Sequence, residues 1–316
     1  MNKVTRLKYY IESLCIYDFE DDDVFSALYD LLCDDEEDTV ALQSYFFKEL
    51  AKSESLKRHI SRLILTNDNI FTKAACAGKV NELSIAVINA VKSDLAKLEE
   101  IASLTAQDIL ADIDDEDIKE ILLTLPGWEV GKPLAPLDSH WDRQLDELIN
   151  YHRENGYGIY AKNIAFTWRD EEITPVNSID PIRLTDLKNY ELQRNKVIDN
   201  TESFIAGHPA NNVLLYGDRG TGKSSTVHAI LNEYWQKGLR MIEIPKSAVA
   251  DLSLIREQIA DSPMKFIIYI DDLSFDSNDT SFSELKAALE GSLSGKQPNT
   301  IIYATSNRRH LIRENF

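Results

Sequence analysis

The chain has little cysteine. Its three cysteines are Cys15, Cys33 and Cys76, an odd number, and none stands in a CxxC pair or at a cysteine/histidine spacing that would bind zinc. A disulfide framework and a zinc module are therefore both disfavoured. Reduced, buried thiols are expected, which favours a cytoplasmic protein.

Long apolar runs are also missing from the sequence. Lys3, Arg6 and Lys8 give a basic start, but Glu12 and Asp18 interrupt the stretch that follows, so no signal-peptide core forms. No segment approaches the roughly 18 apolar residues of a membrane-spanning helix. We therefore expect no membrane partner. A length of 316 residues favours two domains.

Basic side chains are few relative to acidic ones. The chain carries 34 lysines and arginines against 53 aspartates and glutamates, a formal net charge of −19. Such a balance argues against broad binding to nucleic acid or to anionic membranes. A local basic surface would still permit a nucleic-acid partner.

Glycine is nearly absent from residues 1–125, where Gly78 is the one interruption. Apolar residues recur there at spacings of three and four, which predicts amphipathic helices. We expect a mostly α-helical, acidic N-terminal domain over 1–125. Its acid clusters lie at 20–23, 34–38 and 112–117. They are expected in solvated loops and at helix N-termini; the alternative is a docking surface for a basic partner.

Residues 126–183 are expected to form a linker. Prolines and glycines at 126–136 end the helical region. A helix is predicted from Ser139 to Arg153. Two stretches rich in β-branched and aromatic residues, Ile159 to Trp168 and Ile173 to Ile179, predict a small hairpin.

Glycine returns in a cluster at residues 217–222. The stretch from Gly217 to Ser224 has the spacing G-x-x-x-x-G-K-[ST] of a phosphate-binding loop. It lies between a predicted strand and a predicted helix, the context that this motif needs. Backbone N–H groups and the helix N-terminus could then hold a phosphate. The alternative is a glycine-rich turn that matches by chance.

The loop motif predicts ATP and Mg²⁺ as cofactors. Lys223 is expected to reach the β- and γ-phosphates, and Ser224 to hold Mg²⁺ through its hydroxyl. The expected nucleotide-binding residues are Gly217, Asp218, Arg219, Gly220, Thr221, Gly222, Lys223, Ser224 and Ser225.

Two later apolar runs are predicted to be strands that end in polar residues. Residues 266–270 lead into Asp271 and Asp272, and residues 300–306 lead into Asn307. The carboxyl ends of buried parallel strands are where open α/β sheets bind ligands. Asp271 is expected to hold Mg²⁺ as the Walker-B acid. The alternative is a pair of strands that merely end in polar turns.

Three residues form the expected catalytic set. Lys223 would stabilise charge on the phosphates, and Asp272 would orient or polarise the attacking water. Asn307 would contact the γ-phosphate or that water, because an amide both donates and accepts hydrogen bonds.

The order of these motifs resembles the AAA+ ATPase core. It comprises the phosphate loop, a strand at 239–244, a strand ending in Asp271-Asp272 and a strand ending in Thr305-Ser306-Asn307. The resemblance runs over 184–316 and implies an α/β fold, a parallel-sheet P-loop NTPase core preceded by the α-helical N-terminal domain. It also implies that 186–193 lies near the adenine. Leu285, Leu289 and Leu293 predict a further helix.

Four strings are similar, more narrowly, to an uncharacterised family of bacterial AAA+-type ATP-binding proteins. They are residues 190–194, 211–217, 271–275 and 303–312. This second resemblance implies the fold and ATP, and very little about a substrate.

The sequence departs from the AAA+ pattern in two ways. Asp272 stands where most AAA+ proteins carry glutamate, and its shorter side chain bears on water positioning and on the hydrolysis rate. The sequence also stops at Phe316, before the position of an arginine finger, a fifth strand and a helical lid, so we expect a core truncated before the lid. Arg308 and Arg309 lie too close to Asn307 for the usual finger position.

The leading hypothesis is Mg²⁺-dependent ATP hydrolysis coupled to remodelling or regulation of an unknown macromolecular partner, with an ATP-dependent homo-oligomer as one form. A slow-hydrolysing nucleotide-dependent switch or scaffold is the first alternative. A DNA-associated loader ATPase is the second, which the net charge of −19 disfavours. A small-molecule kinase would need an acceptor pocket as well.

Overall fold

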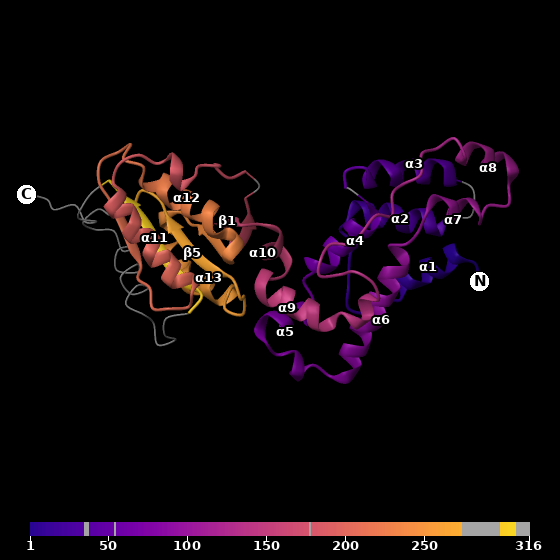
Figure 1. Ribbon diagram of the computed structural model, residues 1–316, viewed down its shortest axis with the longest axis horizontal. Helices are drawn as coiled ribbons and strands as arrows, with labels where there is room; N and C mark the ends of the chain where they lie inside the picture. Colours follow the sequence, from indigo (N-terminus) through magenta and orange to yellow (C-terminus); the bar gives the residue numbers. More distant parts are fainter. Residues whose placement is uncertain (35–37, 54, 177, 274–297, 308–316) are drawn as a thin grey trace, which may run out of the picture. The chain divides into compact units, whose positions relative to one another are not determined.

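The computed structural model describes residues 1–34, 38–53, 55–176, 178–273 and 298–307. The chain divides into two compact units, Met1–Arg153 and Glu154–Phe316. The first consists of helices and the second of helices around a sheet (Figure 1). Among the described residues, no helix combines the length and apolar character that crossing a bilayer requires.

This division differs from the boundaries expected at 125 and 183. The expected linker is shared between the units: Trp141 and Leu148 are fully buried in the helical core of the first, and the hairpin belongs to the sheet of the second. Large apolar side chains that are withdrawn from water stabilise the unit around them, so these residues form part of the packed cores.

The first unit contains helices, with a long irregular connection between Leu122 and Trp141. They are α1 (Lys3–Glu12), α2 (Asp23–Cys33), α3 (Thr39–Leu50), α4 (Leu56–Leu65), α5 (Ile70–Ala77), α6 (Ile85–Ile101), α7 (Ala106–Leu110), α8 (Glu116–Leu122) and α9 (Leu145–Asn155), with the 3₁₀ turns η1 (Val80–Glu82) and η2 (Trp141–Arg143). The helix expected over 139–153 is therefore the turn η2 followed by α9. Gly78 ends α5 in the left-handed conformation at φ 70°, which only glycine adopts without cost.

Apolar spacing along these helices produces one buried core. On α4, Leu56, Ile60 and Ile64 follow each other at intervals of four and are at most 1% exposed, so they lie on one face. The same core contains Leu7 of α1 and Phe46 of α3. The expected amphipathic helices of this region are thus present.

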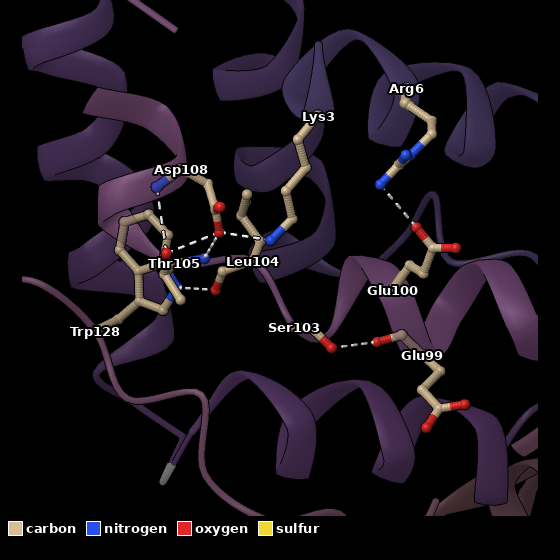
Figure 2. A network of polar contacts seen from close by, with 9 residues as sticks. All are labelled: Lys3, Arg6, Glu99, Glu100, Ser103, Leu104, Thr105, Asp108 and Trp128. Atoms are coloured by element: carbon tan, nitrogen blue, oxygen red, sulfur yellow. Dashed lines mark hydrogen bonds and ion pairs between the residues drawn. The ribbon is translucent and has the colours of Figure 1, made fainter. Parts of the chain in front are cut away.

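Polar contacts join α1 to α6 and α7 (Figure 2). The Lys3 ammonium lies 2.7 Å from the Asp108 carboxylate, and Arg6 lies 3.2 Å from Glu100. Asp108 also accepts hydrogen bonds from the backbone and hydroxyl of Thr105. Together these contacts hold the first helix of the chain against residues about a hundred positions later.

The second unit is built around a six-stranded sheet with the order β2-β1-β4-β5-β6-β3. Its strands are β1 (Ala165–Arg169), β2 (Glu172–Pro175), β3 (Val213–Tyr216), β4 (Leu239–Glu243), β5 (Lys265–Ile270) and β6 (Thr300–Ser306). Neighbouring strands are parallel except for the β1–β2 hairpin, which is antiparallel. The expected α/β class with a mostly parallel sheet is confirmed.

The helices of this unit cover both faces of the sheet. They are α10 (Gly158–Lys162), α11 (Glu191–Ile205), α12 (Lys223–Tyr234) and α13 (Leu252–Gln258), with the 3₁₀ segments η3 (Leu184–Asp186), η4 (Trp235–Lys237) and η5 (Lys246–Asp251). On β5, Phe266 and Ile268 belong to the same core cluster as residues of α13, whereas Ile267 and Tyr269 belong to the cluster of α11 and α12. Alternate residues of the strand therefore face opposite layers.

The beginning of the predicted hairpin differs from expectation. Residues 158–162 form α10, not a strand, and Tyr160 packs its ring 5.3 Å from that of Phe166 and 5.4 Å from that of Phe266. Burial of this aromatic ring under the sheet outweighs the β propensity of the stretch. The helix expected around Leu285, Leu289 and Leu293 lies outside the described residues.

Candidate functional site

Three strands end side by side at the edge where the predicted site residues lie. The sheet order places β6 between β5 and β3, all parallel, with Ile270 beside Ala304 and Tyr216 beside Ser306. Gly217 follows β3, Asp271 follows β5 and Asn307 follows β6. Parallel pairing thus brings together motifs that are far apart in the sequence.

The glycine-rich stretch forms a loop between β3 and α12. Gly220 and Gly222 have φ values of 77° and 79°, and Gly222 directly precedes the first turn of α12. No atom lies within 4 Å of a Cβ built at either glycine. The backbone conformation, and not lack of space, is therefore what requires glycine at these two positions.

The side chain of Lys223 turns back over this loop. Its Nζ donates to the carbonyl oxygens of Gly217 and Asp218, each at 2.8 Å, and to Asn307 Oδ1 at 3.2 Å. Thr221 Oγ1 donates to the Asp218 carbonyl at 2.9 Å and closes the loop from within. The ammonium therefore lies in the mouth of the loop, where a phosphate would be expected.

Ser224 and Asp271 are in direct contact although 47 positions separate them. Ser224 Oγ donates to Asp271 Oδ1 at 2.8 Å. The same oxygen accepts from the Tyr269 hydroxyl at 2.6 Å and from Thr305 Oγ1. Burial alone would raise the pKa of Asp271, but the hydrogen bonds from Thr305, Tyr269 and Ser224 outweigh it and lower that pKa below its usual value. The carboxylate is thus kept ionised.

Asp272 occupies an unusual backbone conformation. Its φ is 49°, in the left-handed region that aspartate tolerates better than most residues. Its N–H donates to Thr305 Oγ1 at 3.0 Å, and its Oδ1 accepts from Asn307 Nδ2 at 2.7 Å. Asn307 therefore links Asp272 to Lys223 through the two ends of one amide. The left-handed φ also gives a reason for aspartate, and not glutamate, at this position.

The remaining predicted residues lie in the loop and the first helical turn. Arg219 is exposed at the tip of the loop, and Ser225 is half-buried at the start of α12. The contacts of the described residues connect neither of them to the strand-end carboxylates. Arg308 and Arg309 lie outside the described residues.

Sequence reasoning missed the supporting hydroxyls of Tyr269 and Thr305. Tyr269 stands two positions before Asp271, so on a strand both side chains point to the same face. Its buried ring lies 5.7 Å from that of His228 on α12. Burial, together with the bond to Asp271, raises the pKa of Tyr269, so the phenol remains a donor. The spacing of two residues between Tyr269 and Asp271 was the feature of the sequence that could have predicted this contact.

A cavity of about 550 Å³ adjoins the loop. Its lining includes residues 187–190, residues of α11 and β3, and Gly217, Gly222 and Lys223 of the loop and the start of α12. The segment expected near an adenine and the expected phosphate loop thus line one space. Its volume lies in the usual range for small-molecule sites.

The strand ends offer few ligands for a metal ion. Within the described ranges, no group of three or more histidine, cysteine, aspartate or glutamate residues could hold a metal ion by itself. A hydroxyl and one ionised carboxylate nevertheless suit Mg²⁺, which keeps several waters and commonly binds through substrate phosphates. Ser224 and Asp271 therefore fit this ion as partners of a bound phosphate.

Residues 161–316 match the model of a family described as Protein of unknown function (DUF815). The matched region contains all of the sheet and the three strand ends. The match confirms the coarser expectation, a likeness to an uncharacterised family. A comparison with curated proteins finds no match to the chain.

Proposed function

We propose that the second unit, Glu154–Phe316, binds ATP with Mg²⁺ and hydrolyses it at the ends of β3, β5 and β6 as an AAA+-type P-loop ATPase. The contact of 2.8 Å between Ser224 Oγ and Asp271 Oδ1 carries this proposal. A serine hydroxyl at a helix N-terminus and an ionised carboxylate at a neighbouring strand end are the pair that a phosphate-bound Mg²⁺ needs.

Lys223 and the loop supply the phosphate contacts in this proposal. The first turn of α12 presents backbone N–H groups at the positive end of the helix dipole. The Lys223 ammonium, which now contacts the carbonyls of Gly217 and Asp218, would release them and pair with the β- and γ-phosphates. Mg²⁺, when bound, supplies positive charge that stabilises the transferring phosphoryl group.

Asp272 and Asn307 would act on the attacking water. The Asp272 carboxylate accepts from Asn307 Nδ2 at 2.7 Å, so the amide fixes the direction in which the carboxylate points. The carboxylate would orient a water for attack on the γ-phosphate. Asn307 Oδ1 accepts from Lys223, so the amide would couple the position of the lysine to that of the carboxylate.

The test is Lys223→Ala in the full chain. We expect the affinity for ATP in the presence of Mg²⁺ to fall by about tenfold or more, because a charge-assisted contact to phosphate is lost, and phosphate release to cease. Binding is measured with a fluorescent ATP analogue and turnover by released phosphate. Lys237→Ala, which removes an exposed lysine of η4, is the matched control and should change neither. Retained turnover in Lys223→Ala would overturn the site assignment.

A slow nucleotide-dependent switch is the second candidate, and the conformation of Asp272 favours it. A carboxylate held by Asn307 at 2.7 Å on a left-handed residue has little freedom to approach a water. This candidate predicts tight ATP binding with slow turnover, and it predicts that Asp272→Ala leaves turnover nearly unchanged. A large fall in turnover would favour the ATPase.

We propose that the macromolecular partner binds to the first unit, which carries the acid clusters. An ATPase that remodels a partner commonly works as a ring, so we propose an ATP-dependent homo-oligomer. The mass of the particle in solution, measured with and without ATP, tests this. A mass that does not change with ATP would favour the switch.

A further inference from the structure

We propose that Arg194 is a positioning residue, which holds residues 187–190 as the nucleoside-side wall of the cavity beside the phosphate loop. This inference rests on the proposed nucleotide binding and adds Arg194, which is not among the site residues expected from the sequence. The ligand class is a nucleoside triphosphate, recognised by its nucleoside as well as by its phosphates.

The guanidinium of Arg194 is hydrogen-bonded to the wall, and Arg194 itself also lines the cavity. Arg194 lies in the first turn of α11 and is half-buried. Its Nη1 donates to the carbonyl oxygen of Leu187 at 2.9 Å and to that of Asn189 at 3.3 Å. Its backbone N–H donates to the Tyr190 carbonyl at 2.9 Å. The side chain thus binds two of the four wall residues, and the bond to Tyr190 is a main-chain bond at the start of α11.

The wall segment needs such a tether because its backbone is strained. Asn189 and Tyr190 have φ values of 64° and 57°, two left-handed residues in succession, and neither is glycine. Asparagine tolerates this conformation, but a tyrosine pays a steric cost in it. In addition, Tyr190 provides no side-chain cap to the start of α11. Strained backbone of this kind persists where surrounding bonds fix it, and such segments cluster at ligand sites.

The fixed segment lies at the correct place for the nucleoside. Leu187, Asn189 and Tyr190 line the same cavity of about 550 Å³ as Gly217 and Lys223. If the triphosphate occupies the loop, the base and ribose extend along the cavity toward residues 187–190. Tyr190 is 56% exposed, so its ring is accessible to a planar ligand.

Arg194 is expected to act through the wall and not through its charge. Its Nη1 already donates to two carbonyl oxygens. Lys196 lines the same cavity from the same helix and is exposed. Removing either residue deletes one positive charge near the cavity, but only Arg194 carries the bonds to Leu187 and Asn189. The two residues therefore form a matched pair for separating charge from positioning.

The experiment compares two ligands on the full chain with Mg²⁺: ATP, and inorganic tripolyphosphate, which has no nucleoside. Isothermal titration gives both affinities for the wild type, Arg194→Ala, Arg194→Lys and Lys196→Ala. Arg194→Ala is expected to lower the affinity for ATP by about tenfold, the effect of losing charge-assisted bonds that preorganise the wall. Its affinity for tripolyphosphate is expected to stay within about twofold of the wild type, a change of the size seen for a screened surface charge.

The ratio of the ATP affinity to the tripolyphosphate affinity separates positioning of the wall from a merely structural role of Arg194. Arg194→Lys keeps the charge and can reach one carbonyl, so its ratio of ATP to tripolyphosphate affinity should lie between those of the wild type and Arg194→Ala. Lys196→Ala should lower both affinities by the same factor. Thermal melting monitors folding, and if Arg194→Ala does not fold, the ratio for Arg194→Lys decides.

Each of the remaining outcomes contradicts a specific part of the proposal. If Arg194→Ala lowers both affinities equally, or neither, Arg194 does not position the nucleoside wall. If the wild type binds tripolyphosphate and ATP equally well, residues 187–190 are not a nucleoside wall. If the wild type binds neither ligand, the proposed nucleotide binding itself fails.

Discussion

The hydroxyl of Tyr269, in the buried strand β5, donates a 2.6 Å hydrogen bond to Asp271, which lies two residues further along the chain. Tyr269 is fully buried, and its ring packs against α12. The hydrophobic core is therefore connected directly to the carboxylate at the edge of the sheet. A substitution of Tyr269 in the core should therefore also change ligand binding at the site.

Tyr269→Phe tests this connection, because it removes the hydroxyl and keeps the ring. We expect the free energy of unfolding to fall by about 1 kcal/mol, the value of one hydrogen bond. The affinity for ATP in the presence of Mg²⁺ should also fall, since one of the hydroxyls that orient Asp271 is missing. Urea denaturation and nucleotide titration measure the two effects.

The control is Tyr234→Phe. The hydroxyl of Tyr234 also donates to a carboxylate, that of Glu202, at 2.9 Å, at the far end of α12 from the loop. Its loss should lower stability and leave the affinity for ATP unchanged. Equal effects of both variants on affinity would show that Tyr269 has no special connection to the site.

Substitutions of Asp272 should separate conformation from charge. An asparagine at this position would tolerate φ 49° nearly as well as aspartate, whereas a longer side chain tolerates it less. Asp272→Glu should therefore lower the free energy of unfolding by about 1 kcal/mol, and Asp272→Asn by less. Both should slow phosphate release. Faster release by Asp272→Glu would mean that the length of the side chain, and not the backbone, limits the reaction.

The contact between Lys3 and Asp108 predicts a pH dependence of stability (Figure 2). Burial alone would raise the pKa of Asp108, but hydrogen bonds from Lys3 and Thr105 lower that pKa below its usual value. A carboxyl group whose pKa is lowered by folding contributes stability above its unfolded value, and the contribution is lost as the pH falls through the folded value.

Lys3→Ala should accordingly destabilise the protein at pH 7 by about 0.5 kcal/mol, as expected for a partly exposed ion pair. The difference from the wild type should shrink once the pH falls below about 4, where Asp108 begins to take up a proton in the unfolded chain. Denaturant titrations over pH 3 to about 7 measure it. Lys92→Ala, which removes an exposed lysine of α6, should show no such trend; a difference that persisted at the lowest pH would refute the assignment.

Asp94 should be among the most sensitive positions of the first unit. It is fully buried, and its Oδ2 accepts from the backbone N–H groups of Cys15 and Ile16 at 2.9 and 2.7 Å and of Tyr17 at 3.3 Å. Asp94→Ala leaves these donors without their acceptor, so the free energy of unfolding should fall by about 3 kcal/mol. Asp94→Asn keeps an oxygen acceptor and should cost less.

Hydrogen exchange locates the effect of Asp94. The amides of residues 15–17 should exchange faster in Asp94→Ala than in the wild type, because their acceptor is missing. Glu120→Ala, which removes an exposed carboxylate of α8, is the control and should alter neither stability nor exchange. Unchanged exchange at residues 15–17 in Asp94→Ala would contradict the role of the carboxylate.

Local patterns in the sequence were sufficient for most elements of the second unit. The helix expected after the glycine-rich loop is α12, Lys223–Tyr234, and the apolar runs before Asp271 and Asn307 are β5 and β6. These strands are six and seven residues long, and the continuous apolar runs within them suit burial on both faces. Because parallel strands share an edge, the proximity of Ser224, Asp271 and Asn307 followed from the same patterns.

Features that depend on distant packing could not be predicted in this way. The left-handed φ of Asp272 depends on its N–H bond to Thr305, a residue of another strand. The two bonds from Arg194 depend on a fold of residues 187–190 that has no periodic pattern. Likewise, the place of Trp141 in the first core is set by helices far from it in sequence, so residues 126–153 resembled a linker.

The β1–β2 hairpin affects how readily the protein aggregates at high concentration. The strand β2 forms one outer edge of the sheet, is four residues long, and carries Glu172 at its start and Pro175 at its end. Proline has no N–H to offer, and a charged, short edge strand is a poor template for another chain. Strand-by-strand growth into fibrils should therefore be blocked on this side, and shortening the chain to begin after residue 175 would expose the parallel edge of β4 to such growth.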